Sequence, residues 1–297
     1  MKKNNVFIIS KPLQYFNATN INTIGSKTCL LVNNFYHAQS VFEAIKRESL
    51  HWNKVFFFET TEDAYKWVLN NKKKISRLFI DSDYGATKYK ILSQIRCIDI
   101  FIYEEGIGNY RNKLKEKGWT GTLKEFFYNL FGNKNYLGGS KYVKGIYLYD
   151  KDRFKNAHPN SRKPIYEFKV SFSEHLKSFQ DKSIFLDQGT RKILSEIKNK
   201  KVFLYLTSWS IFLHIDDLLS EYSDYTKIIK PHPHIKKDID NTFNNFDYVL
   251  KGSDIIEIFI NELLIKFEEV VIAHHGTSSL MYFRDYPKLK TIVINQK

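Results

Sequence analysis

Short apolar runs alternate with segments of helical spacing through the first hundred residues, and this alternation constrains the fold more than any other feature. Strands are predicted at Val6–Ser10, Thr28–Asn33, Lys54–Glu59, Arg77–Asp81 and Asp99–Tyr103. Helices are predicted between them, over residues 14–24, 38–46, 61–69 and 89–95. Strands that are apolar at every position are typical of a parallel sheet buried on both faces, so the pattern indicates a Rossmann-like series of βαβ units.

The same rhythm restarts near residue 202, after a less regular middle section. Its predicted strands are Val202–Thr207, Lys227–Lys230, Tyr248–Leu250, Glu269–Ala273 and Thr291–Asn295, and its predicted helices cover residues 211–222, 255–266 and 277–284. In the middle section we expect helices over 122–131, 171–179 and 191–197, a strand over 145–149 and a loop over 150–163. The fold class is therefore α/β, with two Rossmann-like domains, residues 1–190 and 191–297, that face each other across a cleft.

Two adjacent acids and a glycine, Glu104, Glu105 and Gly106, directly follow the predicted strand Asp99–Tyr103. Ligands of open α/β sheets bind beyond the carboxyl ends of the strands, and glycine lets the backbone approach a ligand closely. Neighbouring carboxylates raise each other's proton affinity, which suits a general base near neutral pH. The stretch is a candidate catalytic centre; a solvated acidic turn is the alternative.

A cation and an imidazole follow the predicted strand Lys227–Lys230, in the sequence Lys230-Pro231-His232-Pro233. The flanking prolines restrict the backbone and so limit the directions in which His232 can point. An imidazole at this place can donate to a phosphate oxygen or act as a general acid. The alternative is a rigid turn whose histidine only satisfies a neighbouring group.

A third candidate lies between the strand Glu269–Ala273 and the helix predicted to follow it, and consists of His275, Gly276, Thr277, Ser278 and Ser279. Hydroxyl residues at a helix start are ordinary N-caps, and capping alone would explain any one of them. Backbone N–H groups, a helix dipole and two adjacent hydroxyls also make a phosphate site. Because this stretch and the Lys230–Pro233 turn end strands of one domain, both could hold the same phosphate.

Other patterns point to no metal or cofactor. Asp81 and Asp83 match a short metal-binding pattern of some glycosyltransferases, but a three-residue match is weak. The histidines at 232, 234, 274 and 275 lack zinc-site spacing, and there is neither a Walker A motif nor a Gly-x-Gly-x-x-Gly at a helix start. The two cysteines, Cys29 and Cys97, lie in or beside apolar runs and suggest a reducing compartment.

The net charge of +14 favours anionic partners such as nucleic acid, acidic lipid or charged substrates. No apolar stretch approaches the roughly 18 residues of a spanning helix, so we expect a cytoplasmic protein, peripheral on the anionic inner membrane. A basic nucleic-acid-binding protein is the alternative of another class, although no recognised binding motif accompanies the charge.

In this order, the motifs Glu104-Glu105-Gly106, His232-Pro233 and Ser278-Ser279 resemble those of the bacterial lipooligosaccharide sialyltransferases and capsular polysialyltransferases. The stretch Pro12-Leu13-Gln14 after the first strand resembles the start of the lipooligosaccharide group. The resemblance implies a GT-B fold, a CMP-sialic acid donor, no metal and inversion at the anomeric carbon. It leaves the linkage, the acceptor sugar and the number of residues added open.

Carried over by position, the resemblance makes Glu105 the base in the acceptor-side domain, with the part played by Glu104 left open. His232 would support or protonate the departing phosphate, and Ser278 and Ser279 would bind it. The expected donor contacts are Gln14, Gly106, Lys230, Pro233, His275, Gly276, Thr277, Ser278 and Ser279. A related GT-B transferase using CMP-Kdo or a CDP-polyol is the closest alternative.

Overall fold

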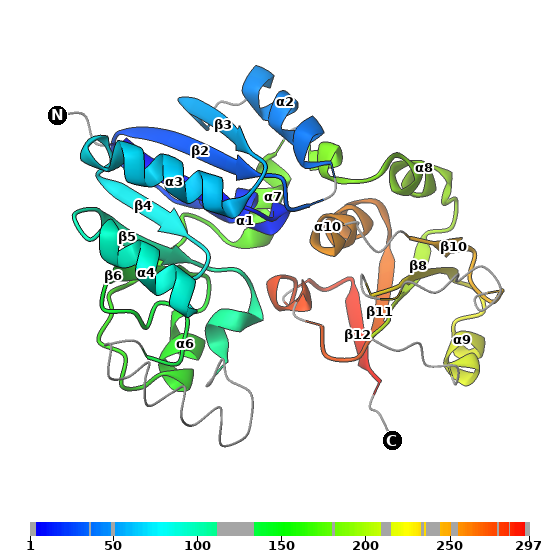
Figure 1. Ribbon diagram of the computed structural model, residues 1–297. Coiled ribbons are helices and arrows are strands. Elements are labelled where there is room, and N and C mark those ends of the chain that lie inside the picture. The colour runs from blue at the N-terminus through cyan, green and yellow to red at the C-terminus, as the bar shows by residue number, and fades with distance from the viewer. Residues whose placement is uncertain are drawn as a thin grey trace. The chain divides into compact units, whose positions relative to one another are not determined.

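A computed structural model shows the chain as two compact units, residues 1–175 and 176–297 (Figure 1). It describes residues 4–35, 37–48, 51–111, 134–179, 182–208, 215–232, 235, 244–250, 255–277, 279–284 and 286–294. The division falls after His175, whereas the expected boundary lay after residue 190, so residues 176–190 belong to the second unit. None of the helices in these ranges combines the length and apolar character that a membrane crossing requires.

The first unit is built on seven parallel strands in the order β3-β2-β1-β4-β5-β6-β7. The strands are β1 Asn4–Ile9, β2 Ser26–Val32, β3 Lys54–Phe58, β4 Arg77–Ile80, β5 Asp99–Tyr103, β6 Val143–Leu148 and β7 Ile165–Glu167. Its helices are α1 Pro12–Asn20, α2 Ala38–Glu48, α3 Thr61–Asn71, α4 Ala86–Gln94 and α6 Lys151–Ala157, with 3-10 turns η1 Lys72–Lys74 and η2 Ile107–Tyr110. Helix α7, Phe172–Ser178, crosses the division between the units. Figure 1 shows α3 and α4 on one face of the sheet and α1 on the other.

Aromatic side chains from neighbouring strands build the centre of this sheet. Phe7 of β1 stacks on Phe79 of β4 with ring centroids 4.3 Å apart, and Phe79 stacks on Phe101 of β5 at 5.3 Å. The three residues are paired in the strand register and all are buried. Aromatic pairs at such distances add to the free energy gained by burying apolar area, so part of the abundant phenylalanine serves the core.

The strand order fixes where a ligand would meet the first sheet. Strand β1 lies between β2 and β4. The chain adds β2 and β3 on one side of β1 and then returns to add β4 to β7 on the other side. The carboxyl ends of β1 and β4 therefore form a topological switch point, where open α/β sheets leave a crevice. Ser10 and Lys11 follow β1 there, and Asp81 follows β4.

The second unit has five parallel strands in the order β10-β9-β8-β11-β12. They are β8 Lys201–Leu206, β9 Thr226–Lys230, β10 Tyr248–Val249, β11 Glu269–His274 and β12 Leu289–Val293. The helices are α8 Gln188–Glu196, α9 Asp216–Glu221 and α10 Ile256–Lys266, with 3-10 turns η3 Lys182–Phe185 and η4 Ser279–Tyr282. The switch point of this sheet lies between β8 and β11.

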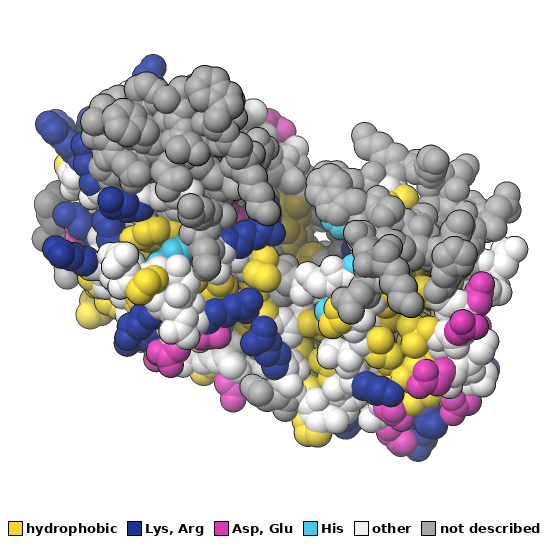
Figure 2. Space-filling model, turned by 90° about the horizontal axis from the view of Figure 1, so that it is seen from below, with side chains coloured by type: hydrophobic (Ala, Val, Ile, Leu, Met, Phe, Trp, Pro, Cys, Tyr) yellow, Lys and Arg dark blue, Asp and Glu magenta, His cyan; other side chains and the backbone are white. Residues whose placement is uncertain are grey.

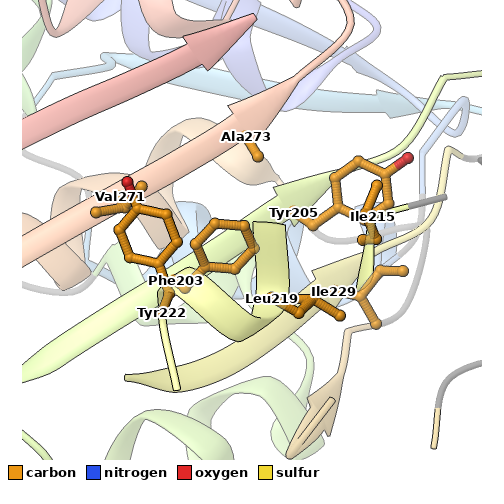
Figure 3. Packing of buried hydrophobic residues seen from close by; sticks show 8 residues of the cluster. All are labelled: Phe203, Tyr205, Ile215, Leu219, Tyr222, Ile229, Val271 and Ala273. Atoms are coloured by element: carbon orange, nitrogen blue, oxygen red, sulfur yellow. The ribbon is translucent and has the colours of Figure 1, made fainter. Parts of the chain in front are cut away.

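A buried cluster joins α9 to one face of the second sheet. Figure 3 shows its members, which are Phe203, Tyr205, Ile215, Leu219, Tyr222, Ile229, Val271 and Ala273. Side chains alternate between the two faces along a strand. Since Val271 and Ala273 face α9, Ile272 and His274 lie on the opposite face of the sheet.

Among the described residues most predicted elements are present, and the prediction differs from the structure at α6, β7 and η4. The expected loop over residues 150–163 contains α6, which Asp150 caps by accepting from the backbone N–H of Arg153 at 2.8 Å. Strand β7 was not predicted. The helix expected over residues 277–284 is the four-residue 3-10 turn η4. The helix predicted over 122–131 lies outside the described residues, as does the first part of the one predicted over 211–222.

Candidate active site

The carboxyl end of β5 presents the acidic pair, and the two acids occupy different environments. The Glu105 side chain is 22% exposed, and its Oε1 forms an ion pair with the Nζ of Lys11, which follows β1. The Glu105 backbone N–H donates to Asn109 Oδ1 at 2.9 Å, which anchors the turn. The turn itself requires Gly106, whose φ of 114° lies in the region that favours glycine. Glu105 is thus a fixed carboxylate with one side open to solvent.

Glu104, in contrast, is fully buried. Its Oε2 accepts hydrogen bonds from the Tyr110 hydroxyl and from the backbone N–H of Tyr149, the latter at 2.9 Å. Burial first, and then the adjacent Glu104 carboxylate, raise the pKa of Tyr110 well above its ordinary value, so the phenol stays a donor. Glu104 therefore ties the end of β5 to the segment after β6.

Helix α1 reinforces the same end of the sheet with two buried amides. Asn17 Nδ2 donates to the backbone carbonyl of Glu104 at 2.7 Å, and Asn17 Oδ1 accepts from the Tyr149 hydroxyl at 2.9 Å. Gln14 Oε1 accepts from the backbone N–H of Ser10 at 2.7 Å, while its Nε2 donates to Asp81 Oδ2 at 3.2 Å. Gln14 is buried, so it holds the ends of β1 and β4 together instead of facing a ligand.

The two acids of the Asp-x-Asp pattern are also engaged within the first unit. Both carboxylate oxygens of Asp83 accept backbone N–H groups, from Gly138 at 2.8 Å and Ser140 at 2.7 Å. Desolvation raises the pKa of Asp83, and these hydrogen bonds oppose that rise. Asp81 lies 3.6 Å from Lys88 Nζ. The pattern thus organises loops of this unit, and no cluster of three or more metal-binding side chains occurs among the described residues.

In the second unit, the predicted phosphate residues gather where β8, β9 and β11 end. Lys230, the last residue of β9, is buried, and its carbonyl accepts from Thr207 N–H at 3.2 Å. The backbone N–H of His232 donates to Thr207 Oγ1 at 2.8 Å, so the chain after β9 is fixed to the chain after β8. Pro233 and Ser278 lie outside the described residues.

His275 takes a structural position, which departs from its predicted contact with the donor. Its Nδ1 donates to the carbonyl of Ile294 at 3.0 Å, because a carbonyl can only accept. Its Nε2 then accepts from the Tyr205 hydroxyl at 2.9 Å. Both ring nitrogens are therefore used to join β8 to the end of β12.

The neighbouring His274, which the sequence analysis left unassigned, has one nitrogen committed. Its Nδ1 accepts the backbone N–H groups of Gly276 at 2.9 Å and Thr277 at 3.2 Å. Burial, and to a smaller extent His275, lower the pKa of His274, so its ring is neutral and carries its proton on Nε2. Side chains alternate between faces along a strand, which predicts that His274 and His275 point in opposite directions. It does not predict which hydrogen bonds each ring forms, because those partners come from other parts of the fold.

The loop after β11 differs from the predicted helix-start phosphate site. Gly276 is exposed and has a φ of 85°, and Thr277 Oγ1 accepts from the backbone N–H of Ser279 at 3.3 Å. Ser279 is buried. Three N–H groups that the prediction left for a phosphate are thus used within the loop, and the 3-10 turn η4 is too short to provide the helix dipole.

Comparisons with known proteins show the fold. No family model and no curated protein matches the sequence. Among solved structures, the chain is similar to the wall teichoic acid polymerase TagF, with a TM-score of 0.57 and 12% identity over 97% of this chain and 69% of TagF. The UDP-GlcNAc 2-epimerase of Neisseria meningitidis, bound to UDP-GlcNAc, gives 0.55 and 13% over 100% and 83%. Anabaena HepE in complex with UDP-glucose gives 0.52 and 11% over 97% and 85%.

These similarities, with the strand orders of both sheets, confirm the predicted fold class. The chain has a GT-B fold with two Rossmann-like domains.

Proposed function

We propose that this protein is an inverting, metal-independent glycosyltransferase that moves sialic acid from CMP-sialic acid to a lipooligosaccharide or capsular glycan. The observation that carries the proposal is the division of roles at the end of β5. Glu104 is buried and hydrogen-bonded, whereas Glu105 is partly exposed beside Lys11 at the carboxyl edge of the sheet. This geometry supports Glu105 as the base and Glu104 as the residue that positions it.

Glu105 would accept the proton of the acceptor hydroxyl as that oxygen attacks the anomeric carbon. The ion pair with Lys11 fixes this carboxylate at the edge of the sheet, where its oxygens can accept a proton. Lys11 is 55% exposed, so its side chain has room to move when the acceptor hydroxyl takes its place next to Glu105. The bond from the anomeric carbon to the CMP phosphate breaks in the same step, and CMP departs with the electron pair.

On the leaving-group side, His232 would donate to the phosphate of the departing CMP. The hydrogen bond from its backbone to Thr207 supports this role because it fixes the segment after β9 at the switch-point edge. The hydroxyls of Ser278 and Ser279 complete the set that the resemblance implies. Donor groups aimed at the departing phosphate stabilise the charge that develops there.

The same fold also suits other cytidine-activated donors, and one comparison favours a specific one. TagF in the presence of CDPG is similar to this chain, with a TM-score of 0.56 at 14% identity. A CDP-polyol is therefore the second candidate donor, and CMP-Kdo is the third. Thermal shift with CMP-sialic acid, CMP-Kdo and CDP-glycerol separates them, because a ligand that binds only the folded protein raises its melting temperature.

The decisive experiment measures CMP release from CMP-sialic acid in the presence of sialic-acid- and galactose-ended acceptors. We expect Glu105→Gln to lower the rate about 10²–10⁴-fold, the range typical of general bases, with an unchanged circular dichroism spectrum. Glu62→Gln, at an exposed position in the first turn of α3, is the matched control. Wild-type turnover in Glu105→Gln would refute the assignment of the base.

A further inference from the structure

The second unit contains a largely buried histidine whose second ring nitrogen the proposed mechanism does not use. His274, the last residue of β11, is only 7% exposed, and its Nε2 has no hydrogen-bond partner among the described residues. An imidazole N–H whose direction is fixed can donate to a ligand that reaches the edge of the sheet. The Nε2 of His274 can therefore donate a hydrogen bond to a group outside the described residues.

The sheet register places a second polar residue on the same face. His274 pairs with Leu206 of β8, and Leu206 pairs with Lys230 of β9. Residues paired across parallel strands point to the same side of the sheet, so His274 and Lys230 flank Leu206 on the face opposite α9. Two strand spacings, about 10 Å, separate their backbones, a distance that a lysine side chain helps to span. Both side chains are buried, each 7% exposed.

The loop after β11 determines whether His274 can donate or accept a hydrogen bond toward a ligand. Because Nδ1 accepts from the backbone N–H groups of Gly276 and Thr277, the neutral ring can only donate, through Nε2. A neutral donor and an ammonium on one face form a site for an anion. The site lies at the carboxyl edge where β8 and β11 define the switch point, which is where open α/β sheets bind phosphorylated ligands.

We infer that His274 and Lys230 bind the phosphate of the nucleotide donor across the end of β8, with Leu206 as the apolar floor between them. The inference rests on the proposed function, since it supplies the nucleotide. It changes the predicted site in one respect: the histidine that contacts the phosphate from β11 is His274, and His275 is structural. His274 is thus a donor-binding residue whose direction the Gly276–Thr277 turn fixes.

Two substitutions at residue 274 separate its two hydrogen-bonding roles. In His274→Asn, the amide oxygen lies near the position of Nδ1 and retains an acceptor for the loop, but the donor to the ligand is lost. In His274→Gln, the amide nitrogen lies near the position of Nε2 and restores that donor. We expect CMP affinity, measured by calorimetry, to fall about 5- to 30-fold in His274→Asn and to recover in part in His274→Gln.

Lys230→Met should lower CMP affinity by a similar factor and should reduce its dependence on salt. Lys227→Met is the matched control, because Lys227 lies on the same strand with its side chain on the opposite face. A proton–nitrogen correlation spectrum of the histidine rings should also show His274 protonated on Nε2, with a signal that shifts when CMP is added.

The outcomes distinguish this inference from the proposed function. If wild-type protein binds CMP and both His274→Asn and Lys230→Met bind it equally well, the inference is wrong while the proposed function stands. If CMP does not bind but inorganic pyrophosphate does, and His274→Asn weakens it, the anion site stands and the proposed donor is wrong. Failure of the wild-type protein to bind either probe overturns the inference.

Discussion

Glu104 and Glu105 are adjacent in the chain, but the atoms around them give them opposite roles. Glu104 accepts hydrogen bonds from Tyr110 and from the backbone of Tyr149 in a fully buried position. Glu105 has Lys11 as its ion-pair partner and remains partly exposed. The same substitution at the two positions should therefore have unequal effects on stability.

We expect Glu104→Leu to lower the free energy of unfolding by about 2–5 kcal/mol, because buried donors lose their acceptor. Glu105→Leu should cost only about 0–1 kcal/mol, the usual value of an exposed ion pair. Urea denaturation followed by circular dichroism measures both. Equal losses of stability in the two variants would contradict the division of roles between the acids.

Two glycines in loops of the first unit have similar backbone angles but different surroundings. Gly85, before α4, has a φ of 107° and nothing within 4 Å of the position that a Cβ would take. Gly138, before β6, has a φ of 90°, and a Cβ there would lie 2.4 Å from Cδ1 of Ile146. Ile146 is fully buried in β6, so it has little room to yield.

Alanine at Gly85 should cost about 1–2 kcal/mol, the strain of a left-handed backbone alone. Alanine at Gly138 adds a steric clash of about 1–3 kcal/mol. It also disturbs the backbone N–H that Asp83 accepts at 2.8 Å. The urea midpoint should therefore fall further in Gly138→Ala than in Gly85→Ala. The opposite order would show that the loop before β6 relaxes to accept the methyl group.

The sequence predicted most strands because each of these is a short apolar run, a signal carried by the strand's own residues, whereas β7 has only three residues and two of them are exposed. Strand β5, for example, has the predicted bounds, Asp99–Tyr103. Helix α6 was missed because only Phe154 of its residues is buried, and its start depends on the Asp150 cap. A helix was expected where η4 occurs because the pattern of residues 277–284 does not distinguish an α-helix from a 3-10 turn.

The roles of adjacent site residues could not be predicted from local sequence, because distant partners assign them. His275 is saturated by Tyr205, 70 residues away in the sequence, and by Ile294. Glu104 is held by Tyr149, 45 residues away. The three sequence motifs identified the carboxyl edge of each sheet as the place where a ligand is expected to bind. Which acid or histidine faces a ligand follows from strand register and packing.

At the scale of the whole molecule, the net charge of +14 is the main property that attracts a partner over long range. Figure 2 shows Lys and Arg side chains at several separate places on the part of the first unit that is drawn in colour. Such a distribution attracts anionic surfaces through many weak contacts, which salt screens within about 10 Å at 0.1 M. The acceptor proposed above, a glycan carried by a lipid, would lie at such an anionic surface.

The protein should therefore sediment with vesicles that contain phosphatidylglycerol at about 0.05 M salt and be released at about 0.3 M, where the screening length is shorter. Phosphatidylcholine vesicles are the control, and they should bind little because they offer no net charge. Retention at high salt would contradict the electrostatic account.

The same salt series with a duplex oligonucleotide tests the nucleic-acid alternative. Two results together would favour nucleic acid: the oligonucleotide displaces the protein from the vesicles, and its binding depends more steeply on salt than vesicle binding does. In that case the net charge would no longer support a membrane-borne acceptor.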